Sequence, residues 1–198
     1  MPALKALMVD VDGVIVIPRL GGWAADLRAD LGVSPAALAQ HFFARHWEDV
    51  VLGRAGLHER LAPVLAEIAP HLSSERLAAY WFAKDSVLDY QLLDDLALLR
   101  ARGLALHLAT VQEHCRAEHL WTRLGLKDQF DAMHYAADLG CAKPAPAFFA
   151  AIGVRTGFEP GEMLLIDDQL ANVEAARAAG WRAAQWTGEY RLADLLTL

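Results

Sequence analysis

The sequence predicts an α/β fold in which a parallel sheet is interrupted, after its first strand, by a segment made only of helices. From residue 89 onward, apolar runs alternate with amphipathic helical patterns, which is typical of a parallel sheet with helical crossovers. Strand signals are missing between residues 18 and 87, although a strand-like run at residues 5–10 precedes this gap. The first strand therefore has to pair with strands that come after the gap.

The elements outside the gap follow one another as in a Rossmann-like sheet. Strands are expected at residues 5–10, 104–110, 132–137, 163–166 and 182–186. Helices are expected around Leu92 to Leu99 and at residues 112–124, 146–156 and 171–179. Gly103, Gly125 and Gly180 follow three of these helices, and glycine is the residue that most readily ends a helix.

The gap itself reads as helices. Ser34 can cap a helix that has Pro35 at its first position, and Ser73 or Ser74 can cap another. Pro63 is expected to separate two short helices between them. We therefore predict a core of residues 1–17 and 88–198 and an inserted all-α cap of residues 18–87.

Size and composition fit a folded protein that acts on small molecules. The chain has 198 residues, of which 55% are hydrophobic, and a net charge of −7. Its arginines are scattered, so no basic face for a nucleic acid is expected. No apolar stretch approaches the roughly 18 residues of a membrane span. Asp10 and Asp12 also interrupt the only candidate leader, so we expect a cytoplasmic protein without a membrane partner.

Chemically useful side chains follow the carboxyl ends of the expected strands. The first strand runs into Asp10 and Asp12, whose side chains project alike because they are two residues apart. Two like charges this close need a cation or a shared proton between them. The later strands lead to Thr110, Lys143, Asp167 and Asp168. Since the carboxyl ends of parallel strands meet at one edge of a sheet, we expect these groups together, as a set suited to phosphoryl transfer.

The order D-x-D-G, strand-Thr, Lys-Pro, Asp-Asp resembles the four motifs of the haloacid dehalogenase (HAD) superfamily. The helical segment resembles the small cap of that superfamily's first cap class. The resemblance spans nearly the whole chain and implies that Asp10 is the nucleophile of an aspartyl-phosphate mechanism. Asp12 would then be the acid and base, Thr110 would bind a phosphoryl oxygen, and Lys143 would keep Asp10 ionised.

The same resemblance implies a Mg²⁺ ion. Its ligands would be Asp10, the backbone carbonyl of Asp12, and Asp168, with Asp167 either a direct ligand or acting through water. Asn172 would support this set or orient Asp168. Gln112 would contact the phosphoryl group or simply start the next helix.

The expected function is a Mg²⁺-dependent phosphatase for a small phosphomonoester. Dehalogenases of the superfamily lack the second aspartate, so Asp12 favours phosphate esters over carbon–halogen bonds. The aromatic content of the cap is similar to that of sugar-phosphate phosphatases. Two alternatives stay open: a phosphomutase of the hexose type, and a non-catalytic relative that binds phosphate or a protein partner.

Overall fold

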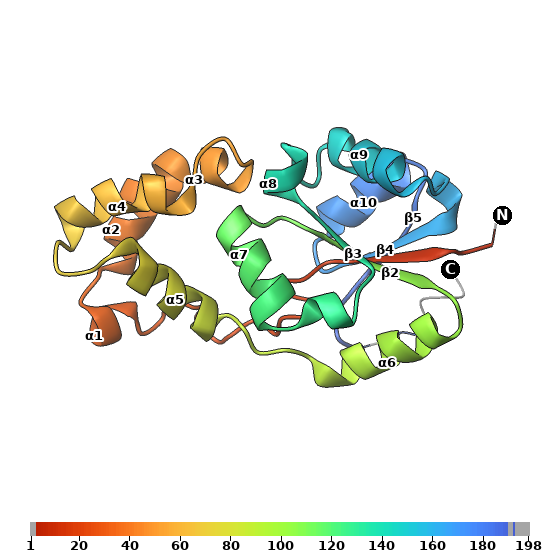
Figure 1. The fold of residues 1–198 in the computed structure, drawn as a ribbon, viewed down its shortest axis with the longest axis horizontal. Coiled ribbons are helices and arrows are strands. Elements are labelled where there is room, and N and C mark those ends of the chain that lie inside the picture. Colours follow the sequence, from red (N-terminus) through yellow and green to blue (C-terminus); the bar gives the residue numbers. More distant parts are fainter. Residues whose placement is uncertain (1–2, 190–191, 193–198) are drawn as a thin grey trace.

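The computed structural model describes residues 3–189 and residue 192 and contains a five-stranded parallel sheet (Figure 1). The strands are β1 (Ala6–Val9), β2 (Ala105–Thr110), β3 (Ala132–Tyr135), β4 (Met163–Asp167) and β5 (Arg182–Gln185). Their order across the sheet is β3-β2-β1-β4-β5. β1 lies in the centre, so the chain moves to one side of it for β2 and β3 and to the other for β4 and β5. The predicted α/β fold is confirmed, and the first strand pairs with strands that follow the helical segment, as expected.

Helices cover both faces of the sheet. They are α6 (Tyr90–Ala101), α7 (His114–Glu118), α8 (Ala136–Leu139), α9 (Pro146–Thr156) and α10 (Leu170–Ala178), with the short turns η2 (His119–Arg123), η3 (Leu126–Asp128) and η4 (Pro160–Glu162). Figure 1 shows α6 on one side of the sheet and α9 and α10 on the other. Side chains alternate along β1 because successive residues of a strand face opposite sides. Leu7 and Val9 join the apolar cluster under α6, while Ala6 and Met8 join the one under α9 and α10.

The segment between β1 and α6 is helical and has an apolar cluster of its own. Its elements are α1 (Leu27–Leu31), α2 (Pro35–Leu38), the π-helical turn η1 (Ala39–Phe43), α3 (Ala44–Val51), α4 (Leu57–Ile68) and α5 (Ser74–Lys84). Figure 1 shows these helices beyond the end of the sheet toward which β1 runs. Aromatic rings pack together inside this segment, among them Trp23 and Trp81, whose stacked rings lie 4.9 Å apart. The division into a cap of residues 18–87 and a core stays a prediction.

Capping explains where two helices of this segment begin. Ser34 accepts a hydrogen bond from the amide of Ala37 at 3.4 Å, and Pro35 is the first helical residue. Ser73, rather than Ser74, caps α5 by accepting from the amide of Arg76 at 3.3 Å. Among the described residues, every helix is too short or too polar to cross a bilayer.

The expectation for Pro63 is wrong, because this proline lies inside the continuous helix α4. A proline at this position removes one helical hydrogen bond, to the carbonyl of Glu59. Pro63 is on the exposed side of α4, where water can satisfy that carbonyl. Leu61 and Leu65 on the opposite side are buried in the cluster and hold the helix in place. Packing of the apolar face therefore outweighs the local preference.

Candidate active site

A cavity of about 370 Å³ lies at the carboxyl ends of β1, β2 and β4. Its walls are formed by Asp10, Asp12, Gly13, Pro18, Thr110, Val111, Asp168, Gln169 and Asn172. It occupies the point where the strand order reverses, which is where open parallel sheets bind ligands. Four of the six residues expected at the strand ends, Asp10, Asp12, Thr110 and Asp168, line this one space. Lys143 and Asp167, the other two, are buried and lie in a chain of contacts with Asp10.

Lys143 bridges two buried carboxylates. Its Nζ atom lies 3.0 Å from Asp10 Oδ1 and 2.5 Å from Asp167 Oδ2. Asp10 Oδ1 also accepts a hydrogen bond of 2.7 Å from the amide of Val11. The side chain of Lys143 is only 1% exposed, so this ion pair is shielded from solvent. The orientation of the Asp10 carboxylate is thereby fixed from within the core.

Burial raises the pKa of Asp10 to about 6. The positive charge of Lys143 acts in the opposite direction, and the negative charge of Asp167 raises the pKa further. Burial also raises the pKa of Asp168, and again Asp167 adds to this effect. In both cases the largest cause is burial, which removes water from the carboxylate and disfavours its charged form. The positive charge of Lys143 therefore does not fully offset the effect of burial on the pKa of either carboxylate.

The carboxylates of Asp10, Asp167 and Asp168 offer oxygen atoms that all lie within 4.8 Å of one another. Three carboxylates around a single lysine leave excess negative charge, and oxygen-only ligands are the set that Mg²⁺ prefers. This donor set, with the raised pKa values of Asp10 and Asp168, fits a divalent cation. The side chain of Asp12 is not part of this group, and the role of its backbone carbonyl as a ligand stays a prediction.

Asp167 is fully buried and both of its oxygen atoms have protein partners. Oδ2 pairs with Lys143, while Oδ1 accepts hydrogen bonds of 2.9 Å from the Gln169 amide and from Asn172 Nδ2. Asn172 therefore supports Asp167, and the alternative that it orients Asp168 is not what the structure shows. Asp168 instead accepts a hydrogen bond of 2.6 Å from the side chain of Gln169.

Gly13 is required by the close approach of the Asp10 loop to Asp168. Its φ angle is +83°, and a Cβ atom at this position would lie 2.6 Å from Asp168 Oδ2. Side chains other than glycine rarely adopt such a backbone conformation. The glycine of the D-x-D-G motif thus lets two carboxyl-bearing loops face the same cavity.

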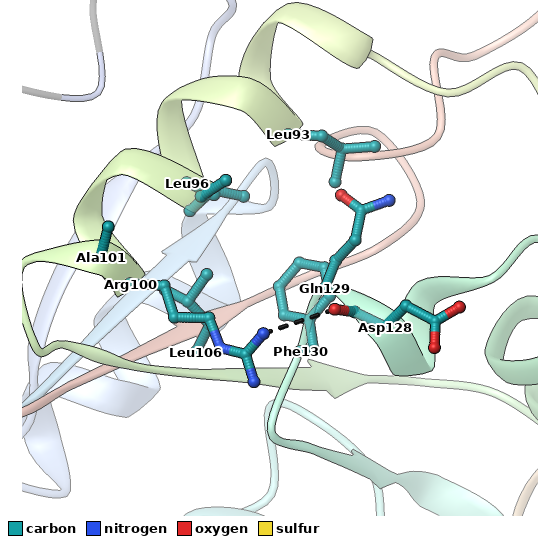
Figure 2. A pocket seen from close by; sticks show the side chains of 9 residues that line it. Leu93, Leu96, Arg100, Ala101, Leu106, Asp128, Gln129 and Phe130 are labelled. Carbon is teal, nitrogen blue, oxygen red and sulfur yellow. Dashed lines mark hydrogen bonds between the residues drawn. The ribbon is translucent and has the colours of Figure 1, made fainter.

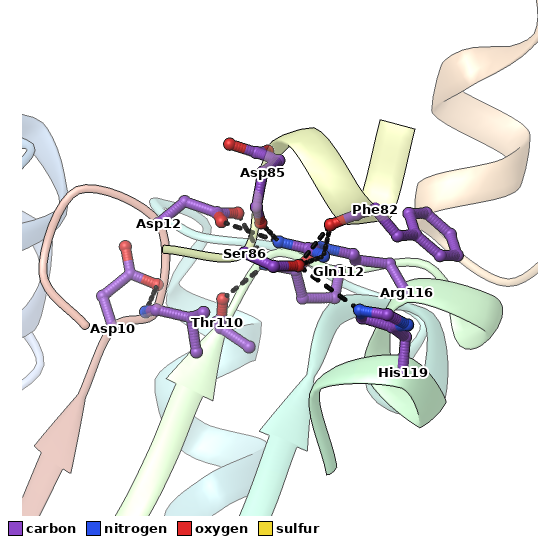
Figure 3. Close-up of polar contacts among 10 residues, drawn as sticks. Asp10, Asp12, Phe82, Asp85, Ser86, Thr110, Gln112, Arg116 and His119 are labelled. Atoms are coloured by element: carbon purple, nitrogen blue, oxygen red, sulfur yellow. Dashed lines mark hydrogen bonds and ion pairs between the residues drawn. The ribbon is translucent and has the colours of Figure 1, made fainter. Parts of the chain in front are cut away.

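Asp12 also lines the cavity, and its partners differ from those of Asp10 (Figure 3). Its Oδ2 accepts a hydrogen bond of 2.6 Å from Gln112 Nε2, which also donates to Thr110 Oγ1 at 3.2 Å. Its Oδ1 lies 3.9 Å from the guanidinium of Arg116. Because Thr110 Oγ1 acts as an acceptor here, its own hydroxyl hydrogen remains available for another acceptor.

The sequence did not reveal that Gln112 and Arg116 contact Asp12. Gln112 does not begin a helix. The helix α7 begins at His114, because the Glu113 carboxylate caps it by accepting hydrogen bonds from the amides of Cys115 and Arg116. The role of Arg116 had no motif that could reveal it.

A second cavity, of about 420 Å³, lies between α6 and η3 and away from the strand ends (Figure 2). Its walls include Leu93, Leu96 and Phe130. Arg100 reaches across it, donating to the carbonyl of Asp128 at 3.4 Å and pairing with Asp131 at 2.5 Å. The residues that line this cavity are largely apolar, and they include none of the strand-end residues singled out from the sequence.

The sequence profile of the haloacid dehalogenase-like hydrolase family matches residues 4–180 of the chain. Phosphoglycolate phosphatase of Chromobacterium violaceum is 32% identical over 203 residues, which cover 98% of this chain and 89% of that protein. Fructose-1-phosphate phosphatase YqaB of Escherichia coli is 33% identical over 120 residues, covering 60% of this chain and 63% of that protein.

Solved structures show the same fold. A HAD family enzyme of Bacteroides thetaiotaomicron, determined as a magnesium complex, superimposes with a TM-score of 0.83. The superposition covers 100% of both chains, at 18% sequence identity. At this level of identity the likeness concerns the fold, including the helical segment between the first strand and the rest of the sheet.

Proposed function

The chain belongs to the haloacid dehalogenase-like hydrolase family and hydrolyses phosphate esters, and we propose that it does so as a Mg²⁺-dependent phosphatase with an aspartyl-phosphate intermediate. One observation supports this most: Asp10, Asp12, Thr110 and Asp168 face a single cavity, and Lys143 holds Asp10 from behind. Groups that lie up to 158 positions apart in the sequence thus form one set for phosphoryl transfer.

In the first step, an Asp10 oxygen attacks phosphorus and a bond forms between them. The bond from phosphorus to the ester oxygen breaks, and that oxygen takes a proton from the Asp12 carboxyl group. Thr110 donates its hydroxyl hydrogen to a phosphoryl oxygen, since Gln112 already occupies an acceptor position of the hydroxyl. The products of this step are the alcohol and an acyl phosphate on Asp10.

In the second step, water attacks phosphorus and gives a proton to Asp12, which is now ionised. The bond between phosphorus and the Asp10 oxygen breaks, so inorganic phosphate leaves and Asp10 is restored as a carboxylate. Lys143 keeps Asp10 in place throughout, because its contacts to Asp10 and Asp167 do not involve the substrate.

The residues that would hold Mg²⁺ are Asp10, Asp168 and the backbone carbonyl of Asp12. When bound, the ion neutralises charge on the phosphate and on the attacking carboxylate. Asp167 is proposed to act through Lys143 and through water, because both of its oxygen atoms already have protein partners.

The substrate is proposed to be a small phosphorylated hydroxy acid or sugar. The names of the relatives support this class, since they include phosphoglycolate and fructose-1-phosphate phosphatases. Cap aromatics are a weaker argument, because Trp23 and Trp81 stack on each other within the cap cluster.

The proposal is tested by measuring phosphate release from 4-nitrophenyl phosphate, 2-phosphoglycolate and fructose 1-phosphate, each with Mg²⁺ and with a chelator. We expect turnover that requires Mg²⁺ and is lost in Asp10→Asn. Hydrolysis that continues in Asp10→Asn would contradict the assignment of Asp10 as the nucleophile. Full activity in the presence of the chelator would contradict the requirement for Mg²⁺.

A further inference from the structure

A buried arginine of the core contacts the segment that joins the cap to the core. Arg116 is 2% exposed. It donates hydrogen bonds to the carbonyl of Phe82 and to Ser86 Oγ, both at 3.3 Å, and to the carbonyl of Asp85. We call residues 82–86, the last turn of α5 and the residues after it, the cap linker. Three acceptors of the cap linker thus meet on one guanidinium.

The same guanidinium faces Asp12. The distance from Arg116 Nη2 to Asp12 Oδ1 is 3.9 Å, which is too long for a hydrogen bond but short enough for attraction between the charges. In Figure 3 the guanidinium lies between the Asp12 carboxylate and the linker. Gln112 directs the other oxygen, Oδ2, through its hydrogen bond of 2.6 Å. Residues 112 and 116 therefore direct both oxygen atoms of one carboxylate.

The linker contacts are essential for Arg116 because a buried cation is costly without partners. Burial lowers the pKa of Arg116, while Asp12 and Asp85 act in the opposite direction. The guanidinium of Arg116 donates its hydrogen bonds to neutral oxygen atoms of the cap linker. These oxygen atoms replace the water that burial removes. If the linker were displaced, the guanidinium would have to move toward another acceptor, and Asp12 is the nearest carboxylate that the structure pairs with it.

We propose that Arg116 is a positioning residue that couples the seating of the cap linker to the orientation of Asp12. This inference rests on the proposed function, in which Asp12 protonates the leaving group. The further point is that proton transfer from Asp12 to the leaving group requires the cap linker to contact Arg116. Attack by Asp10 on phosphorus does not require this contact. Arg116 thereby links the enclosure of the substrate by the cap to the orientation of Asp12.

The leaving group provides the test. An alkyl phosphate leaves as a basic alkoxide and needs the acid, whereas 4-nitrophenyl phosphate leaves as a stable anion that needs little protonation. The value of kcat/KM reports steps up to the first irreversible one, here the attack of Asp10. We expect Arg116→Met to lower kcat/KM for an alkyl phosphate about 30-fold and for 4-nitrophenyl phosphate at most about 3-fold, since general acid catalysis contributes typically 10²- to 10⁴-fold.

Two comparisons separate positioning from simple damage to the fold. Arg116→Lys retains a charge and is expected to recover part of the loss for the alkyl phosphate. Arg123→Met removes an exposed arginine of the following turn η2 and is expected to leave both substrates unchanged. Circular dichroism and thermal unfolding establish which variants fold.

A linker variant tests the same coupling from the other side. Ser86→Ala removes the one side-chain acceptor that the linker gives to Arg116, and we expect a loss of about 3-fold confined to the alkyl phosphate. This loss should disappear when Ser86→Ala is combined with Arg116→Met, because contacting residues are not additive. If Arg116→Met does not fold, Ser86→Ala alone decides the question by its effect on the ratio of the two substrates.

Equal losses for both substrates in the folded Arg116 or Ser86 variants would overturn the coupling while leaving the phosphatase proposal intact. Turnover by Asp10→Asn would instead overturn the proposed function. The two failures are therefore distinguishable in one set of assays.

Discussion

The two sides of the active-site cavity hold their carboxylates in different ways. On the side of the sheet, Asp10 is buried and contacts Lys143, which in turn contacts Asp167 at the end of β4. On the side of the cap, the side chain of Asp12 is 50% exposed, and its partners Gln112 and Arg116 come from one short segment. Two residues apart in sequence, the two aspartates belong to different networks.

The two networks are proposed to serve different tasks: that of Asp10 holds the nucleophile and the metal ion, and that of Asp12 transfers protons. The network of Asp10 consists of residues of the core, so its geometry does not depend on where the cap lies. The network of Asp12 reaches the cap linker through Arg116. A fixed nucleophile combined with an acid that senses the cap allows hydrolysis to depend on the substrate being enclosed.

The largest expected effect is on the side of the sheet. Asp10→Asn keeps the shape of the side chain but removes the nucleophile, and we expect phosphatase activity to fall by roughly 10³-fold or more for every leaving group. Steady-state phosphate release measures this. Asp138→Asn, an exposed carboxylate paired with Arg155, is the matched control and should keep wild-type activity.

The next effect concerns stability. Lys143→Met leaves Asp10 and Asp167 buried without their shared cation, and breaking a buried pair costs about 3 kcal/mol of unfolding free energy. Urea unfolding in a chelator measures this value. Lys5→Met removes an ion pair with Glu162 in which the lysine is 56% exposed, and it should cost below about 1 kcal/mol. Similar losses of unfolding free energy in both variants would mean that the buried contacts of Lys143 stabilise the fold no more than an exposed ion pair does.

A smaller effect is expected on the side of the cap. Gln112→Met removes the donor to Asp12 Oδ2 at nearly constant volume, and we expect kcat/KM for an alkyl phosphate to fall about 10-fold, as for the loss of a hydrogen bond to a charged group. The aryl substrate should be affected less. Gln91→Met, on the exposed face of α6, serves as control. A uniform loss for both substrates would remove Gln112 from the network of Asp12.

The smallest effect lies outside both networks. His107 Nδ1 and His134 Nε2 are 2.9 Å apart on β2 and β3, which requires one ring to donate and the other to accept. Burial, and after it the charge of His107, lowers the pKa of His134 to about 4, below its value of about 6.5 in an unfolded chain. The unfolded chain therefore binds more protons between these pH values, and stability falls as the pH falls.

Between pH 7 and 5.5 this histidine pair should cost about 1 kcal/mol, measured by urea unfolding. His134→Phe should lose that part of the pH dependence, and the exposed His71→Phe should retain it. An unchanged slope in His134→Phe would locate the acid sensitivity elsewhere, including the two carboxylate networks.

Local signals explain how much of the fold could be predicted. The strand runs at β1 and β4 end in acidic pairs, and Ser34 and Ser73 cap helices as their types suggest. Pro63 shows the limit of such signals, because the burial of Leu61 and Leu65 is a property of the folded cluster and not of the local sequence. Tertiary packing therefore keeps α4 continuous through Pro63.

The site could be predicted only in part for a related reason. Strand ends can be recognised from the sequence, and they carry or directly precede Asp10, Asp12, Asp167 and Asp168. The contact between Gln112 and Asp12 joins residues 100 positions apart. Arg116 reaches the linker from a helix whose start is shifted by the cap at Glu113. No short pattern encodes either contact, so the network of Asp12 became visible only in three dimensions.

The separation of the two networks is tested most directly by locating the phosphoryl group in Asp12→Asn after reaction with 4-nitrophenyl phosphate and Mg²⁺. Attack requires the side of the sheet only, whereas release of the enzyme requires Asp12 as base. Mass spectrometry of the quenched protein should therefore find a phosphoryl group accumulating on Asp10. A phosphoryl group on another residue, or none despite turnover, would contradict this division of roles.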